Sequence, residues 1–328
     1  MYDAVIVGQG LAGTVLAWTL RPRRVLLIDR EDAVTSSKIA AGLITPITGK
    51  RLAVADRWGE LWPVAVAFYR RVEAETGARF FHEGPAVRLF ADAGERELFE
   101  QRNSTGWRHW SSPLPQSEHW GRGEQPSPEP NLFAPHGGFE MPAARLDVPQ
   151  FLAVSRDFFR PDYLAADIDP AHDIELLPDR VRLPRLGVET ECLVFCQGYS
   201  PNPHFPDVTF NAAKGEILTL RIPGLAETRV VHRGVWLVPL GDERFLAGST
   251  YEWEQLDTVP TATRRDEICA RVREFVRLPF EVIDHTAAVR PVIDAGKPVV
   301  EVRGRLGIFN GLGSKGALLA PFFATRLL

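Results

Sequence analysis

The sequence predicts an α/β fold in which a discontinuous Rossmann-type domain is joined to a smaller α+β domain with a mostly antiparallel sheet. Three observations support this prediction. The chain opens with a strand, a glycine-rich turn, a helix and a second strand, βα patterns return in the middle and at the end, and sheet-like segments lie between them. At 328 residues the chain also exceeds the length at which a single hydrophobic core usually stops growing. We therefore expect two packed lobes.

The first strand–helix–strand unit has the clearest pattern. Residues 2–7 (YDAVIV) form a short β-branched run, which is typical of a strand buried on both faces. Gly8 and Gly10 interrupt this run, and the following residues predict a helix over 11–20 that Pro22 ends. A second buried strand is predicted over 24–28.

The rest of the chain alternates between helical and strand-like patterns. Helices are predicted over 61–76, 94–101, 148–159, 266–276 and 316–328, and strands over 79–82, 86–90, 163–167, 191–195, 214–221, 234–240, 244–250 and 306–310. The three strands between 214 and 250 follow one another closely, which favours an antiparallel sheet. Residues 111–131 are rich in Pro, Ser and Gln, and we expect a long surface loop there, flanked by tryptophans.

Composition excludes several classes of protein. The formal net charge is -4, which argues against a general nucleic-acid binder because phosphate neutralisation needs an excess of Lys and Arg. The three cysteines form neither a disulfide framework nor a metal-ligand pattern, so a reducing cytoplasm is the expected compartment. No apolar run reaches the roughly 18 residues that a membrane-spanning helix needs, and the first apolar segment lacks the basic region of a signal peptide.

A dinucleotide-binding fingerprint lies in the first turn. Gly8, Gly10 and Gly13 match G-x-G-x-x-G between a buried strand and a helix, which is the context that the motif requires. The helix N-terminus, which includes Leu11 and Ala12, offers free N–H groups to a pyrophosphate. Asp29, followed by Arg30, ends the second strand, where a carboxylate accepts hydrogen bonds from ribose hydroxyls. The fingerprint by itself does not separate FAD from NAD.

Four further segments carry a family resemblance. SSKIAAGLITP (36–46), LVFCQGYS (193–200), AAVRPVIDAGKP (287–298) and NGLGSKGALLAP (310–321) together resemble the D-amino acid oxidase-like flavoenzymes, which include glycine and sarcosine oxidases. The resemblance covers nearly the whole chain in the family's order. The LGSKG…AP ending is similar to the oxidase domain of the bifunctional tRNA 5-methylaminomethyl-2-thiouridine-modifying enzyme.

The resemblance implies FAD as the cofactor and a set of residues that hold it. Together with the fingerprint residues, these are Ser36, Ser37, Ala41, Gly42, Gly198, Gly311, Leu312, Gly313, Ser314, Lys315 and Gly316. The last six would bring backbone N–H groups to the pyrimidine edge of the flavin, where a helix N-terminus stabilises negative charge. The family's covalent members use Cys or His to attach the flavin, and the corresponding segments here lack both, so non-covalent FAD is expected.

The resemblance also implies a substrate clamp. Arg290 occupies the place of the arginine that binds the substrate carboxylate in amino-acid-oxidising relatives, and a planar guanidinium suits that role. Pairing of Arg290 with Asp284 or Asp294 is the alternative. Tyr251 and Arg51 are further candidates for catalysis, although a core tyrosine and an exposed loop charge explain them equally well. No lysine is convincingly placed to activate oxygen, so oxygen and another electron acceptor both remain open.

The leading hypothesis is FAD-dependent oxidation of the C–N bond of a small amino acid or secondary amine, by hydride transfer to flavin N5. Oxidation of a modified nucleoside on tRNA and a flavin-binding sensor without turnover are the alternatives. We expect residues 1–76, 146–202 and 284–328 to form the FAD-binding domain, and residues 77–145 and 203–283 to form the substrate domain. We expect no metal site.

Overall fold

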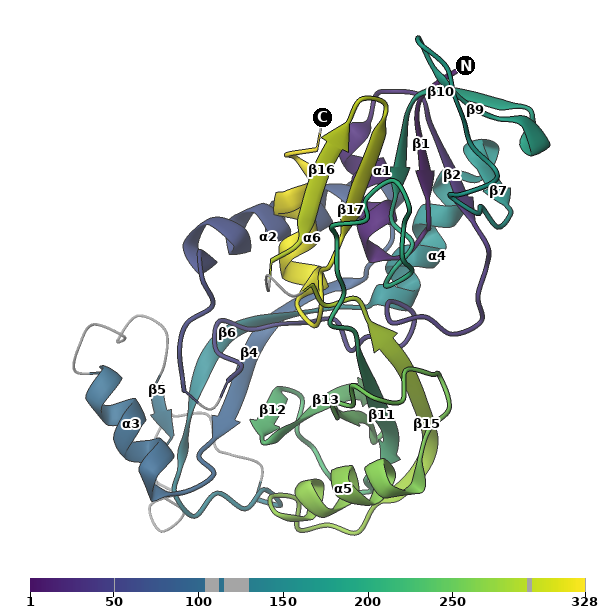
Figure 1. Cartoon of the computed structure of the whole chain (residues 1–328). Helices are drawn as coiled ribbons and strands as arrows, with labels where there is room; N and C mark the ends of the chain where they lie inside the picture. Colours follow the sequence, from purple (N-terminus) through teal and green to yellow (C-terminus); the bar gives the residue numbers. More distant parts are fainter. Residues whose placement is uncertain (50, 104–111, 115–129, 294–296, 328) are drawn as a thin grey trace.

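The computed structural model describes residues 1–49, 51–103, 112–114, 130–293 and 297–327. Within these residues the chain forms an 8-stranded and a 9-stranded β-sheet with helices packed on both. Figure 1 shows the first sheet in the upper part of the molecule, near both termini, and the second sheet below it. The structure confirms the predicted mixed α/β fold class.

The first sheet is largely parallel. Its main path runs β16-β17-β10-β1-β2-β7, and β8 and β9 extend from β10. The strands are β1 (Tyr2–Val7), β2 (Val25–Asp29), β7 (Tyr163–Ala165), β8 (Glu175–Leu176), β9 (Val181–Leu183), β10 (Val188–Phe195), β16 (Val299–Arg303) and β17 (Leu306–Asn310). β1 pairs in parallel with both β2 and β10, whereas β16 is antiparallel to β17.

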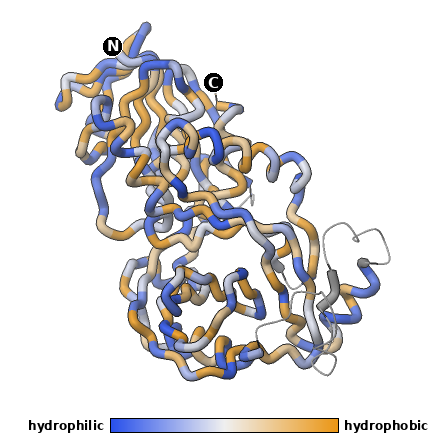
Figure 2. The backbone as a smooth tube through the Cα atoms, turned by 180° about the vertical axis from the view of Figure 1, so that it is seen from behind, coloured by the Kyte–Doolittle hydropathy of each residue, from blue (hydrophilic) through white to orange (hydrophobic). Residues whose placement is uncertain are grey.

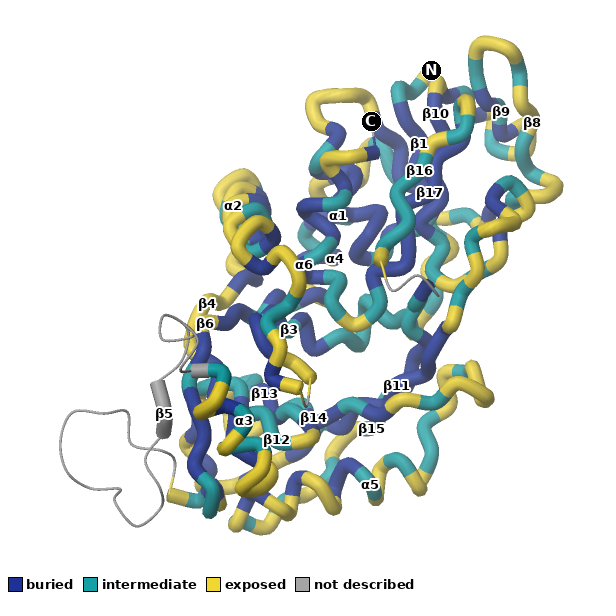
Figure 3. The backbone as a smooth tube through the Cα atoms, turned by 60° about the vertical axis from the view of Figure 1, so that its left-hand side comes forward, coloured by how far each residue is buried: buried dark blue, intermediate teal, exposed yellow. Residues whose placement is uncertain are grey.

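Helices bury one face of this sheet. They are α1 (Leu11–Leu20), α2 (Trp58–Thr76), α4 (Val148–Phe158) and α6 (Gly316–Ala324). In β1, Ala4 and Ile6 join the core with these helices, whereas Val5 and Val7 point to a second apolar cluster on the opposite face. Because both faces are covered, β1 and residues 192–195 of β10 are mostly apolar. Figure 2 shows hydrophobic segments near the N-terminus, and Figure 3 shows β1 and β10 as largely buried.

The second sheet is mostly antiparallel and follows the order β15-β11-β14-β13-β12-β4-β6-β3, with β5 beside β6. Its strands are β3 (Leu43–Ile44), β4 (Phe81–Leu89), β5 (Ser112–Leu114), β6 (Gly138–Leu146), β11 (Ala213–Arg221), β12 (Val230–Arg233), β13 (Val235–Gly241), β14 (Arg244–Gly248) and β15 (Glu281–Arg290). Among the described strand pairs of this second sheet, only β12 and β4 are parallel.

Alternating side chains give the second sheet two different faces. Leu218, Leu220 and Leu237 pack with Ile268 and Val272 of α5 (Ala262–Arg273) in one apolar core. Helix α3 (Ala93–Asn103) contributes Phe99, whose ring stacks on Phe139 at 4.4 Å. The other face, which carries Gly215, Ile217 and Trp236, borders the cavity described below.

Several predicted elements need correction. The separate runs at 79–82 and 86–90 form one continuous strand, β4, because β6 pairs with it along its whole length. The predicted loop at 111–131 contains a strand, β5, and its residues 115–129 lie outside the described residues, as do Trp107, Trp110 and Trp120. Helix α5 covers 262–273, so the helix predicted over 266–276 was set a few residues too far along the chain. Helix α6 begins at Gly316 as predicted but ends at Ala324, so the predicted helix was too long. Eight strands were not predicted: β3, β5, β6, β8, β9, β12, β15 and β16.

The predicted division into an FAD-binding and a substrate domain stays a prediction. No helix in the described part of the chain combines the length and apolar character needed to cross a membrane.

Candidate active site

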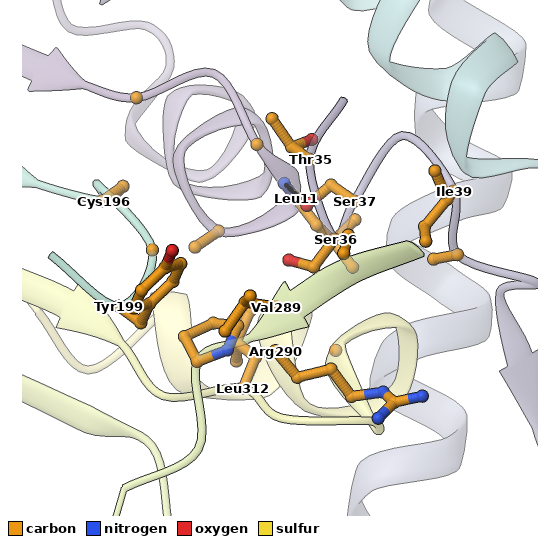
Figure 4. Close-up of a pocket in the computed structure, with 18 of the residues that line it drawn as sticks. Leu11, Thr35, Ser36, Ser37, Ile39, Cys196, Tyr199, Val289, Arg290 and Leu312 are labelled. Atoms are coloured by element: carbon orange, nitrogen blue, oxygen red, sulfur yellow. Dashed lines mark hydrogen bonds between the residues drawn. The ribbon is translucent and has the colours of Figure 1, made fainter. Parts of the chain in front are cut away.

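A cavity of about 530 Å³ lies where the parallel strands of the first sheet end and one face of the second sheet begins. We call it the first cavity. It is lined by the turns that follow β1, β2, β7, β10 and β17, which is where open α/β sheets bind their ligands. Figure 4 shows side chains that line it from separate segments, including Leu11, Ser36, Tyr199 and Arg290. The sheet topology therefore collects distant parts of the sequence at one place.

The glycine turn after β1 depends on close backbone packing. Gly8 has φ +103°, and a Cβ there would lie 2.4 Å from the carbonyl oxygen of Cys196. A Cβ at Gly13 would lie 1.9 Å from the carbonyl oxygen of Gly8, so only glycine lets α1 pack against this turn. The cavity is lined by Gly8, Gly10, Leu11 and Ala12. Gly13 does not line it, and instead packs against the Gly8 carbonyl.

Asp29 lies at the end of β2 and borders the cavity together with Arg30. Its Oδ2 accepts a hydrogen bond from the Gln9 N–H at 2.6 Å, and its Oδ1 accepts one from the Glu31 N–H at 2.8 Å. These bonds hold the carboxylate beside the glycine turn. A carboxylate oxygen accepts more than one hydrogen bond, so Asp29 can also receive ribose hydroxyls.

The segment 36–42 crosses the N-terminus of α1. Ser37 Oγ accepts a hydrogen bond from the Leu11 N–H at 3.0 Å, and Ser36, Ser37, Ala41 and Gly42 all line the cavity. Gly42 has φ +68°, and a Cβ there would meet the Leu146 carbonyl oxygen at 1.9 Å. This close approach ties the segment to the end of β6.

The turns after β10 and β17 are joined to each other. The Asn310 side-chain amide donates a hydrogen bond to the Gly198 carbonyl, and the Gly311 N–H donates to Asn310 Oδ1 at 2.9 Å. Gly198 lines the cavity, as do Leu312, Gly313, Ser314 and Gly316 before and at the start of α6. Gly311 instead packs on Ile293, and Lys315 borders a second cavity. Backbone N–H groups at a helix start suit an anionic edge of a ligand.

Arg290 ends β15 and enters the first cavity. Its Nη2 donates to Ser249 Oγ at 2.8 Å, its Nη1 donates to the Thr250 carbonyl at 3.2 Å, and its guanidinium lies 4.5 Å from the centre of the Tyr251 ring. Burial lowers the pKa of Arg290 from its ordinary value. No carboxylate of the described residues lies within ion-pair distance of this guanidinium.

The two carboxylates considered as partners of Arg290 do not alter this picture. Asp284 is exposed and forms no ion pair with Arg290, and Asp294 lies outside the described residues. Arg290 is half-buried, and partial removal of a cation from water without a facing carboxylate lowers the stability of the folded protein until a ligand supplies one. The described geometry therefore leaves Arg290 ready for an anionic group.

The other two predicted catalytic residues do not line the first cavity, although the Tyr251 ring lies beside Arg290. Tyr251 is 43% exposed, stacks on Trp253 and borders the second cavity. Arg51 is exposed and borders neither cavity. Lys50 lies outside the described residues.

Several residues of the first cavity were missed in the sequence. Asp167 and Ile168 follow β7, and Gln197 and Tyr199 follow β10. The rule that ligands bind beyond the carboxyl ends of parallel strands could have found these residues. Cys196 also borders the cavity, but burial raises the pKa of its thiol, which disfavours a reactive thiolate.

The fold and the cavity define a dinucleotide-binding two-sheet oxidoreductase. The chain belongs to the family of FAD dependent oxidoreductases (DAO), whose model matches residues 3–327. It is thus an FAD-dependent enzyme, and FAD is its cofactor.

Solved structures share this fold. Glycine oxidase from Geobacillus kaustophilus is 21% identical, with 98% of this chain and 92% of that chain covered and a TM-score of 0.81. Iminodiacetate oxidase from Chelativorans sp. BNC1 is 19% identical, with coverage of 99% and 94% and a TM-score of 0.77. L-α-Glycerophosphate oxidase from Mycoplasma pneumoniae, with FAD bound, is 14% identical, with coverage of 99% and 93% and a TM-score of 0.74. These neighbours act on different substrates, so the likeness shows the fold alone.

Proposed function

We propose that the enzyme oxidises the C–N bond of a small amino acid or secondary amine that carries a carboxylate, and that Arg290 binds this carboxylate. The observation that carries the proposal is the half-buried Arg290 guanidinium in the first cavity, which has no carboxylate partner among the described residues. Glycine oxidase and iminodiacetate oxidase, whose names give carboxylate-bearing amines as substrates, are among the structural neighbours.

The first cavity fits the cofactor. Its lining includes the glycine turn, Asp29 and the start of α6, which are an anion site, a ribose acceptor and a second set of N–H donors. We propose that the predicted FAD-binding residues bordering this cavity hold FAD directly, and that Gly13 and Gly311 act through backbone packing. Bound FAD supplies the two-electron acceptor, which takes a hydride at N5.

Arg290 would orient the substrate. Its contacts with Ser249 and Thr250 fix the plane of the guanidinium, and the Tyr251 ring restricts one of its faces. A carboxylate on such a planar donor forms two parallel charge-assisted bonds, which sets the direction of the neighbouring C–H bond. The chain's main contribution at this step is positioning.

Proton removal from the substrate amine falls to solvent in this account. The described lining of the first cavity contains no histidine, lysine or glutamate, and its thiol is held protonated by burial. Its three aspartates, Asp29, Asp32 and Asp167, lie at or just after the ends of β2 and β7 on the segments that we assign to FAD, whereas Arg290 ends β15. The amine must be neutral before a hydride leaves the adjacent carbon. The rate of flavin reduction should therefore rise with pH until the bound amine is deprotonated.

Replacement of Arg290 tests the proposal. Arg290→Leu should bind FAD normally but lose carboxylate ligands by about 100-fold or more, since charge-assisted bonds to a half-buried arginine are lost. Arg290→Lys should recover only part of this affinity. Arg221→Leu, on an exposed end of β11, is the control. Equal carboxylate affinity in wild type and Arg290→Leu would refute the clamp.

A further inference from the structure

A second cavity of about 560 Å³ adjoins the first. Both are lined by Leu43, Trp236, Ser249 and Ser314, so the two spaces meet at this boundary. The second cavity lies between the second sheet, the start of α3 and the start of α6. A ligand held at Arg290 therefore has room to extend past Trp236.

A row of cross-strand neighbours leads from one cavity to the other. Arg88 of β4 pairs with His232 of β12, His232 pairs with Trp236 of β13, and Trp236 pairs with Gly248 of β14. Gly248 pairs in turn with Ile217 of β11, two residues from Gly215, over which the Arg290 guanidinium lies.

Residues paired across strands point to one face of a sheet, so this row forms a continuous floor. The four strand spacings from β11 to β4 amount to about 19 Å along the sheet.

Arg88 lies at the far end of this floor and is 3% exposed. Its Nη2 pairs with Glu95, but its Nε and Nη1 have no hydrogen-bond partner among the described residues. Buried guanidinium donors almost always find acceptors, because an unpaired donor loses its bonds to water without replacement. Two open donors on one buried side chain therefore point to a missing acceptor.

The acidic residues nearby do not supply this acceptor. Glu95 uses its second oxygen to accept the Ala91 N–H at 2.7 Å, and Asp92 accepts the Glu95 N–H at 2.8 Å at the start of α3. Neither carboxylate accepts a hydrogen bond from Arg88 Nε or Nη1 in the described structure. At this end of the cavity, the groups that lack a hydrogen-bond partner among the described residues are therefore donors.

Two more side chains extend the set of open donors. His232 lines the second cavity, and its buried Nδ1 has no partner within the described structure. Burial and the charge of Arg88 lower the pKa of His232 to about 3, so the ring is neutral near pH 7 and can donate through one nitrogen. Lys315 borders the same space, and its ammonium forms no ion pair with any described carboxylate.

We propose that the second cavity binds the distal part of the substrate and selects a substituent that ends in a hydrogen-bond-accepting oxygen, a carboxylate or an amide carbonyl, through Arg88, His232 and Lys315. This inference rests on the proposed function, because the other end of the same molecule is held at Arg290. The substrate class is accordingly an amino acid or amine with a long polar substituent, larger than glycine.

Non-oxidisable ligands provide the test. The FAD-loaded full chain is titrated with suberate, its monoamide suberamate and octanoate, and with the matching trios built on adipate and sebacate. Binding is followed by perturbation of the visible flavin spectrum and by calorimetry. At the best-fitting length, the dicarboxylate and the monoamide should bind about tenfold more tightly than the monocarboxylate. Equal affinities at every length would overturn the inference.

Variants locate the effect. Arg88→Met/Glu95→Gln removes the buried pair without leaving an unpaired charge, and it should abolish the preference, measured as the ratio of the dicarboxylate affinity to the monocarboxylate affinity within this variant. The control Arg229→Met/Glu227→Gln/Glu140→Gln removes another group of ion-paired side chains, which borders neither cavity, and it should keep the preference. If the Arg88 variant keeps the preference for ligands with a distal oxygen, the inference is also overturned. If that variant does not fold, the ligand series on the wild-type protein is the test of the inference.

Failure of the inference is distinguishable from failure of the proposed function. If monocarboxylates bind, and Arg290→Leu abolishes this binding, the clamp stands even when the distal oxygen adds nothing. If no carboxylate of any length perturbs the flavin spectrum, Arg290 does not bind carboxylates. The inference about the second cavity then fails as well, because it depends on that binding.

Discussion

The guanidinium of Arg290 lies directly over the α-carbon of Gly215, where a Cβ would come within 1.8 Å of Nη2. The two residues are on neighbouring antiparallel strands, β15 and β11, and Gly215 pairs with Ala288. The missing side chain on β11 is therefore what gives Arg290 its position. Lys214 and Glu216, on either side of this glycine, are buried in a polar network with Asp257 and Thr261.

Gly215→Ala should displace the guanidinium and weaken carboxylate binding by about 10- to 100-fold, because the bidentate geometry is lost. Affinity for FAD should change little. Gly84→Ala is the matched control, since Gly84 also lies in a strand of this sheet but a Cβ there meets nothing within 4 Å. Titration of both variants with acetate measures the effect. Tight acetate binding in Gly215→Ala would contradict the assigned position of Arg290.

Gly13→Ala should reduce both FAD affinity and stability. The added Cβ would collide with the Gly8 carbonyl oxygen and press on Ile6, so α1 and the turn must separate. Overpacking of this kind costs about 1–3 kcal/mol. Gly59→Ala in α2, where a Cβ meets nothing, should instead be neutral or slightly stabilising. Urea unfolding of the two apo-proteins compares them, and equal stability would show that the close packing at Gly13 is unimportant.

Asp29→Ala should raise the dissociation constant of FAD by about 10-fold or more, since charge-assisted hydrogen bonds contribute about 1.5–3 kcal/mol. It also removes the acceptor for the N–H groups of Gln9 and Glu31. Asp29→Asn keeps the shape and one acceptor, and a smaller loss is expected. Fluorescence titration of apo-protein with FAD measures both. Unchanged affinity in Asp29→Ala would exclude a ribose contact.

His232 should make the protein less stable in acid. Its folded-state pKa of about 3 lies below the ordinary value of 6.5, so between these values the unfolded state binds a proton that the folded state does not. The free energy of unfolding therefore loses nothing to His232 above about pH 6.5, and it falls by up to about 1.4 kcal/mol for each pH unit below that value. His232→Asn should lessen this decline. Parallel curves of unfolding free energy against pH for both proteins would contradict the buried neutral histidine.

The sequence predicted the first sheet better than the second. β1, α1 and β2 are local in sequence and carry the glycine turn, so periodicity and turn chemistry were enough to find them. β4 was divided because Glu83, Gly84 and Pro85 have low strand propensity, and only pairing with β6 keeps them extended. The fit of Arg290 over Gly215 depends on strand register, which sequence pattern does not fix at this distance.

The second cavity was beyond sequence reasoning for a similar reason. Arg88 and His232 lie in different strands, and the parallel pairing of β4 with β12 brings them together. Neither residue belongs to a motif. By contrast, Asp29, Gly8 and Gly10 of the first cavity were predicted as site residues because their roles follow from a local strand–turn–helix geometry, whereas the other glycines of this cavity came from the family resemblance.

The most direct test mixes the FAD-loaded enzyme, without oxygen, with glycine, sarcosine, iminodiacetate, proline, D-amino acids that include D-glutamate and D-glutamine, N-substituted glycines whose long chains end in a carboxylate or amide, and glycerophosphate, while the visible flavin absorbance is recorded. The account predicts that at least one carboxylate-bearing amine bleaches the flavin, and that Arg290→Leu slows this bleaching strongly at low substrate concentration. Bleaching by glycerophosphate alone, or a bound flavin that none of these amines reduces, would contradict C–N oxidation as the function.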